Sequence, residues 1–105
     1  MVEDALVVMV TCPADKAPVL AAALVEERVA ACVNVVPGLL SVYRWKGAVQ
    51  QDPETLLLAK TTVGRFDALK ALVLRHHPHE LPEVIALKVD RGHVPYLDWI
   101  QESTR

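Results

Sequence analysis

One stretch of the sequence decides the fold: Arg28-Val-Ala-Ala-Cys-Val-Asn-Val-Val-Pro-Gly-Leu-Leu-Ser-Val-Tyr-Arg-Trp-Lys-Gly47. From Ala31 to Val49 the chain is rich in β-branched and aromatic residues, which favour a β-strand. Only Pro37-Gly38 interrupts this run, and such a pair indicates a bulge or a bend. A single strand of this length would reach on the order of 60 Å at about 3.3 Å per residue. Since a compact domain of this size has a radius of gyration of only about 13 Å, we predict an arm that neighbouring subunits must cover.

The rest of the sequence predicts strands and helices that alternate on both sides of this arm. The expected strands cover 5–11, the arm at 31–49, 54–62 and 84–89, with a turn at Gln50–Pro53 between the arm and the next strand. The expected helices run from an N-cap at Asp15 to about Glu27, from Thr62 or Gly64 to Pro78, and over 95–100. Their order predicts an α+β fold, a ferredoxin-like βαββαβ sandwich with a long hairpin and a short C-terminal helix.

The pattern of apolar residues predicts that one sheet face is buried by the chain itself and the other by a second copy. Right-handed crossovers place the first two helices on the same face. In the first helix the apolar stripe comprises Ala17, Leu20, Ala21 and Leu24 and extends to Arg28. The strands at 5–11 and 84–89 and the arm are nevertheless apolar on both faces. Because the chain has little left to cover the second face, we predict a closed homo-oligomer.

Length and composition limit the class of protein. The 105 residues predict a single domain, 1–105, and a hydrophobic fraction of 52% argues against disorder. A net charge of −2 without a basic run argues against a nucleic-acid partner. No apolar run approaches the roughly 20 residues that span a bilayer, so no membrane partner is expected. The short acidic N-terminus does not resemble a secretory signal, and two cysteines fit reduced thiols, so we expect a cytoplasmic protein.

The densest polar cluster, Arg75–Glu83, contains His76 and His77 and is a candidate metal site. Imidazole and carboxylate groups suit divalent transition metals, and Cys12, at the end of the first strand, is a possible third donor. The alternative is structural, because cationic groups at the end of a helix interact favourably with its dipole.

Three other residues are candidates for a ligand cleft. Lys60 shares a strand face with leucines and could hold an anion, although a lysine near a strand end can also extend to water. Tyr43 and Trp45 alternate on one face of the arm and could line a cleft or anchor a subunit interface. No phosphate loop, nucleophile with its base, or carboxylate pair can be picked out, so an enzyme is not expected.

Seven segments, which together span nearly the whole chain, resemble the CutA divalent-cation-tolerance family. They are Thr11-Cys12-Pro13, Arg28–Asn34, Pro37-Gly38, Ser41–Gly47, Leu58–Thr62, His77–Glu83 and Tyr96–Trp99.

The resemblance implies an interlocked homotrimer of ferredoxin-like subunits, similar to PII signalling proteins, in the cytoplasm. It implies tolerance of copper and other divalent cations, with no organic cofactor. It also implies a cleft between subunits that collects Cys12, Lys60, His77 and Glu83. Copper contacts are expected from His76 and His77 together with a first-strand cysteine, here Cys12.

Three functions therefore remain open. The first is a trimer that binds copper or another divalent metal between subunits. The second is a PII-like sensor of a small anionic metabolite, with Lys60 and Arg28 as contacts. The third is a structural or anchoring trimer for a protein partner, which would use the aromatic, two-faced arm.

Overall fold

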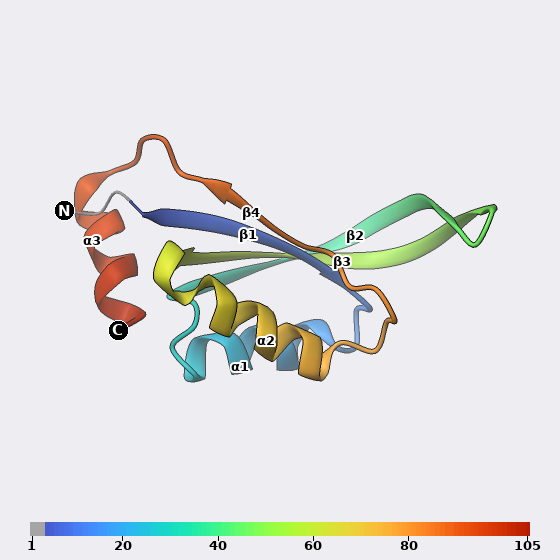
Figure 1. Ribbon diagram of the computed structural model, residues 1–105, viewed down its shortest axis with the longest axis horizontal. Coiled ribbons are helices and arrows are strands. Elements are labelled where there is room, and N and C mark those ends of the chain that lie inside the picture. Colours follow the sequence, from blue (N-terminus) through green and yellow to red (C-terminus); the bar gives the residue numbers. More distant parts are fainter. Residues whose placement is uncertain (1–3) are drawn as a thin grey trace.

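The computed structural model describes residues 4–105, in which four antiparallel strands form one sheet (Figure 1). The strands are β1 (Ala5–Cys12), β2 (Cys32–Trp45), β3 (Ala48–Thr62) and β4 (Val84–Lys88). Their order across the sheet is β2-β3-β1-β4, so β1 pairs with both β3 and β4. The predicted ferredoxin-like βαββαβ fold is confirmed.

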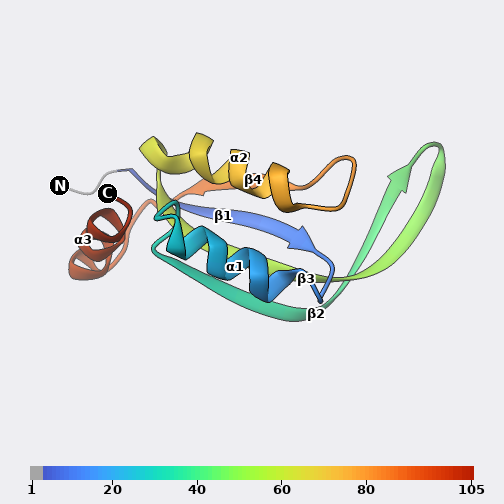
Figure 2. The ribbon, with the colours of Figure 1, turned by 90° about the horizontal axis from the view of Figure 1, so that it is seen from below.

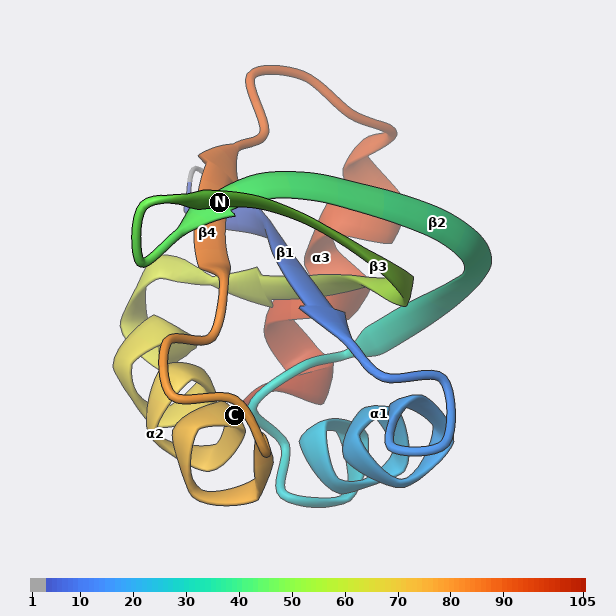
Figure 3. The same ribbon diagram turned by 90° about the vertical axis from the view of Figure 1, so that its right-hand side faces the viewer.

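Two helices cover the same face of this sheet, as the right-handed crossovers require (Figure 3). They are α1 (Ala17–Glu26) and α2 (Phe66–His76), the latter preceded by a 3₁₀ turn at Val63–Arg65. The C-terminal helix α3 (Val94–Ser103) lies apart from them, at one end of the sheet (Figure 1).

The start and the end of α1 differ from the prediction. The helix begins at Ala17 after Lys16 and has no side-chain cap, so the expected N-cap at Asp15 is wrong. The predicted stripe is buried as far as Leu24, but Arg28 is exposed and lies outside the helix. Its φ of 59° is left-handed, which ends the helix before the chain enters β2.

The core lies between this sheet face and the two helices. Its side chains come from alternate positions of the strands and from one stripe of each helix, which is the packing that both periodicities dictate. The largest fully buried apolar side chains at this interface are Val8, Val10, Leu24, Leu57, Leu69 and Val73.

The arm is a two-stranded hairpin that bends at Pro37-Gly38. Val36 pairs with Leu56 and Leu39 with Glu54, so two residues of β2 oppose one of β3 in a bulge. Gly38 adopts a φ of 84°, which glycine permits. Beyond the bulge the hairpin curls away from the sheet (Figure 2), and the longest dimension of the chain is 46 Å.

The tip of the hairpin lies at Lys46-Gly47, so the predicted turn at Gln50–Pro53 is wrong. Trp45 pairs with Ala48 across the tip. Lys46 and Gly47 have φ values of 50° and 81°, the backbone of a two-residue type I′ turn, whose twist matches that of the flanking strands. The segment at 50–53 belongs instead to β3, because the tight turn lets the pairing continue to the end of the arm.

The sheet face opposite the helices carries apolar side chains that residues 4–105 leave partly uncovered. On β4, Ile85 and Leu87 are 49% and 53% exposed. Val7, Met9 and Leu58 lie on the same face by register and are only partly buried. The prediction of a second apolar face therefore agrees with the geometry of one chain.

Candidate functional site

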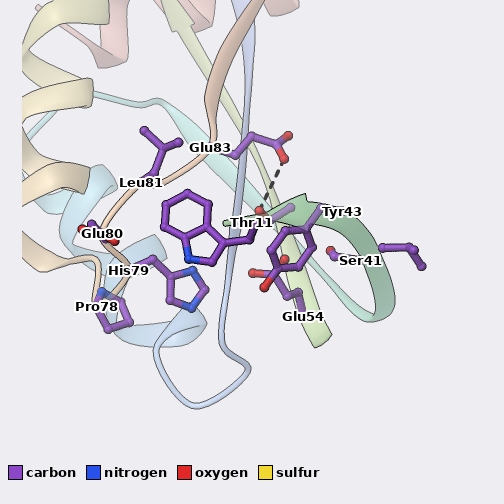
Figure 4. A pocket seen from close by; sticks show the side chains of 11 residues that line it. Thr11, Ser41, Tyr43, Glu54, Pro78, His79, Glu80, Leu81 and Glu83 are labelled. Atoms are coloured by element: carbon purple, nitrogen blue, oxygen red, sulfur yellow. Dashed lines mark hydrogen bonds between the residues drawn. The ribbon is translucent and has the colours of Figure 1, made fainter. Parts of the chain in front are cut away.

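A cleft of about 600 Å³ lies between the curled arm and the loop that joins α2 to β4 (Figure 4). The arm contributes Tyr43, Trp45 and Glu54 to its lining. The loop contributes His79 and Glu83, among other residues, and β1 contributes Thr11. The cleft therefore joins three segments that are far apart in the sequence.

Strand alternation places the arm residues in this cleft. Tyr43 and Trp45 are two positions apart on β2 and share a face. Glu54 pairs with Leu39, which lies an even number of residues before Tyr43 on β2. The side chain of Glu54 therefore emerges on the same face as Tyr43 and Trp45.

The lining of the cleft is acidic. Three carboxylates, those of Glu54, Glu80 and Glu83, face it together with the imidazole of His79. Lys46 reaches Glu80 at 3.8 Å, but both side chains are more than two-thirds exposed, so this rim ion pair contributes little. The local charge favours a cation over an anion.

Glu54 has an unmet bonding requirement. Its Oε2 atom is inaccessible to solvent and has no hydrogen-bond partner among residues 4–105. A buried carboxylate oxygen without a partner is costly, and a cation or a donor from another chain would offset that cost.

A fourth carboxylate, that of Asp52, bonds to a cleft residue on the arm. Tyr43 donates a hydrogen bond from its hydroxyl to Asp52 across the hairpin. This bond, which favours the protonated phenol, is the main cause that raises the pKa of Tyr43 above its usual value. Tyr43 is therefore a neutral donor in the cleft at physiological pH.

Cys12 does not face the cleft. It shares the helix-covered face of β1 with Val10, two residues before it, and both are fully buried. Burial in the core, with smaller contributions from Glu54 and Asp15, raises the pKa of the Cys12 thiol. A buried, protonated thiol is a poor metal ligand.

The two adjacent histidines diverge. His76 is the last residue of α2 and is exposed. His77 is buried, with Nε2 2.7 Å from the Thr11 carbonyl and Nδ1 3.1 Å from the backbone nitrogen of His79. Within the described part of one chain, no three His, Cys, Asp or Glu side chains are already grouped to hold a metal, so Cys12, His76 and His77 are not brought together.

Three of the four residues expected in a cleft line this one: Tyr43, Trp45 and Glu83. Lys60 does not line this cleft, and its place in a cleft between subunits stays a prediction. It lies on the open face of the sheet and donates to the Asn34 side-chain oxygen. It lies six positions after Glu54 on β3, about 20 Å along the strand.

Sequence reasoning missed Glu54, His79 and Glu80 as cleft residues. The signal for Glu54 was the register of the hairpin. A turn at Lys46-Gly47 pairs Glu54 with Leu39 and so places Glu54 on the face of Tyr43. A turn at 50–53 gives a different register, from which this pairing does not follow.

Across residues 4–105, no helix is both long and apolar enough to cross a membrane.

Fold and cleft together define a small ferredoxin-like α+β protein with a long curled hairpin and an acidic cleft beside it. The sequence model of the CutA1 divalent ion tolerance protein family matches residues 6–103. The chain therefore belongs to the CutA1 divalent ion tolerance family, as the resemblance predicted.

Individual relatives agree with this assignment. The chain is 52% identical over 99 residues to the "Divalent-cation tolerance protein CutA" of Thermus thermophilus, covering 93% of this chain and 96% of that protein. It is 47% identical over 96 residues to the human "Protein CutA", covering 90% of this chain but only 54% of the human protein.

Solved structures show the same fold. The divalent cation tolerance protein (Cut A1) from Thermus thermophilus superposes with a TM-score of 0.94 at 51% identity, over 96% of this chain and 99% of that one. The "PII-like protein CutA" from Nostoc superposes with a TM-score of 0.90 at 32% identity, over 95% and 97% of the two chains.

Proposed function

We propose that this chain is a non-enzymatic, homotrimeric protein that binds a divalent cation in the acidic cleft, which a neighbouring subunit completes. The observation that carries the proposal is the buried, unpartnered Oε2 atom of Glu54. Glu83, Glu80 and His79 lie around the same cleft and are the nearest candidates for further ligands.

The donor set favours a borderline or hard divalent ion. Carboxylates suit Mg²⁺, Ca²⁺ and Mn²⁺, and an imidazole shifts the preference towards Zn²⁺ and Cu²⁺. Since affinities at a given site rise from Mn²⁺ to Cu²⁺ in the Irving–Williams order, we expect Cu²⁺ to bind more tightly than Zn²⁺, and Zn²⁺ more tightly than Mn²⁺.

Because no three donors are grouped in the described part of one chain, the ion requires movement of the loop or a ligand from a neighbour. Loop side chains such as Glu80, which is exposed, can move at small cost. The ligand set expected from the sequence, Cys12 with His76 and His77, remains a prediction that only the assembled protein can fulfil.

An anionic metabolite in this cleft has less support. Neither Lys60 nor Arg28 lines the cleft, and three carboxylates would repel an anion there. The aromatic arm remains compatible with an anchoring role, but no feature of the described residues specifies a protein partner.

Titration calorimetry of the intact protein with Cu²⁺ and Zn²⁺ tests the proposal. Glu54→Gln keeps the shape of the side chain and removes its charge, so we expect Zn²⁺ affinity to fall by about tenfold or more, which is about 1.4 kcal/mol. Glu26→Gln, which removes an exposed carboxylate at the end of α1 and outside the cleft, is the matched control and should bind as the unaltered protein does.

Two outcomes would overturn this assignment. One is weak binding, in the millimolar range, that Glu54→Gln leaves unchanged. The other is tight binding that His76→Ala and His77→Ala remove while Glu54→Gln retains it, which would return the ion to the histidine pair.

A cytoplasmic location belongs to the same proposal. Both cysteines are free thiols, with Cys12 buried and Cys32 partly buried, as expected in a reducing compartment. Cell fractionation with an antibody against the chain checks this, and recovery in an oxidising compartment would contradict it.

A further inference from the structure

The loop between α2 and β4 is held at both of its ends by one residue of β1. At its start, the ring of His77 lies with Nε2 2.7 Å from the backbone oxygen of Thr11. At its end, the Thr11 hydroxyl donates to Glu83 Oε1 at 3.5 Å, a long and weaker bond that is drawn in Figure 4. Residues 78–83, which form one wall of the cleft, therefore lie between two attachments to the same strand.

The contacts of His77 fix its tautomer. The backbone N–H of His79 can only donate, so the His77 Nδ1 atom, 3.1 Å away, must accept. The Thr11 carbonyl can only accept, so Nε2 carries the proton and donates. A neutral imidazole has one donor and one acceptor, and both are used here.

The same ring also orders the neighbouring cleft residue. The His77 and His79 rings lie with centroids 4.8 Å apart and tilted by 60°. His77 is only 9% exposed, whereas His79 is exposed and faces the cleft. The buried ring is therefore placed to set the backbone and the side-chain direction of the exposed one.

We propose that His77 is a positioning residue for cation binding: it ties the cleft loop to β1 through Thr11 and presents His79 to the cleft, without contacting the ion itself. The inference rests on the proposed cation-binding function. Its physical basis is that the one lone pair of the neutral ring already accepts the His79 N–H, so ligation by His77 would break that contact, while the Nε2 bond to Thr11 is what tethers the loop.

Two substitutions separate positioning from ligation. His77→Gln retains an N–H donor at about the place of Nε2 and can keep the bond to Thr11. His77→Phe keeps a buried ring but has no polar atom. We expect Zn²⁺ affinity within about threefold of the unaltered protein for His77→Gln, and a loss of about tenfold or more for His77→Phe, by titration calorimetry. His93→Gln serves as the control for loss of an imidazole elsewhere.

Amide hydrogen exchange of residues 79–83 without metal gives a readout that does not depend on cation binding. In His77→Phe these amides should exchange about tenfold faster or more, because the loop loses its tether, and in His77→Gln they should exchange nearly as in the unaltered protein. If the unaltered protein binds no Zn²⁺, the proposed function fails, while the exchange comparison still tests the tether.

Three results would overturn the inference. The first is loop exchange that His77→Phe leaves unchanged. The second is faster exchange in His77→Phe with Zn²⁺ affinity retained. The third is equal loss of Zn²⁺ affinity in both variants while the loop of His77→Gln exchanges normally, which would make His77 a ligand.

Discussion

At the scale of single residues, Glu54 stands out against Thr61 and His77, two buried side chains whose polar atoms have well-defined partners. Thr61 is fully buried and donates to the Val29 carbonyl at 2.6 Å, which fastens the loop after α1 to β3. His77 is satisfied through both ring nitrogens. A carboxylate oxygen left unpaired in such an interior indicates a partner from outside the chain.

Thr61→Val should destabilise the fold. The substitution preserves shape but leaves the buried Val29 carbonyl without its donor, which costs about 1–3 kcal/mol. Urea unfolding should show a lower midpoint at an unchanged slope. A midpoint within error of the unaltered protein would mean that this hydrogen bond contributes nothing.

Cys12 should make stability depend on alkaline pH. Burial raises its pKa above the ordinary 9.0, so the folded state disfavours the thiolate. The protonated thiol contributes fully to stability below the pKa that Cys12 has in the unfolded state. This contribution is lost as pH rises through the higher pKa of Cys12 in the folded state. The free energy of unfolding of the unaltered protein, relative to that of Cys12→Ala, should be constant up to about pH 8 and should decrease above about pH 9.

Unfolding curves at several pH values check the Cys12 prediction. A difference that stays constant up to about pH 10.5, well above the ordinary thiol pKa, would contradict it.

At the scale of elements, the hairpin arm shows what the sequence could and could not predict. Its length, its bend at Pro37-Gly38 and the sharing of one face by Tyr43 and Trp45 follow from composition and strand period. The turn does not, because Lys46-Gly47 lacks the Asn-Gly or Asp-Gly signal and a lysine at positive φ is uncommon. Gln50–Pro53 carried the stronger turn signal.

The misplaced turn explains why Glu54 was missed as a cleft residue. Strand register depends on the turn, and an error there conceals which residues face each other. The loop at 77–83 could not be placed either, since its position depends on long-range bonds from Thr11 that have no sequence period. The strand period therefore predicted that Tyr43 and Trp45 share a face, whereas nothing in the sequence period could place His79 and Glu80 of the loop in the cleft.

Gly47→Ala should destabilise the arm, since a Cβ at a φ of 81° costs about 1–2 kcal/mol. Lys46→Asn is the matched variant, because asparagine tolerates the left-handed region and the substitution removes only an exposed ion pair and a cation–π contact with Trp45. Thermal unfolding should show a lower Tm for Gly47→Ala and an unchanged or higher Tm for Lys46→Asn. Equal effects of the two would place the turn elsewhere.

At the scale of the whole molecule, the open face of the sheet is the feature from which we predict an assembly. A chain with a radius of gyration of 14.2 Å extends over 46 Å because its arm projects from the body. We predict that a neighbouring subunit covers the half-exposed apolar residues on β4 and lies beside Glu54 on the arm. Closed symmetry then gives each subunit the same covering contacts.

Ile85→Glu should prevent assembly, because it would bury an unpaired charge at the subunit contact. Val19→Glu, at a site on α1 that is 71% exposed, is the matched apolar-to-acid control and should leave assembly unchanged. Sedimentation velocity should show smaller species only for Ile85→Glu. If both variants sediment like the unaltered protein, the open face is not an interface.

The most direct test of a trimer with one cation cleft per subunit is native mass spectrometry of the full chain with and without added Zn²⁺. We predict a species of three 11.6 kDa chains that gains three metal ions. A folded single chain, or a trimer that takes up no metal, would contradict the account.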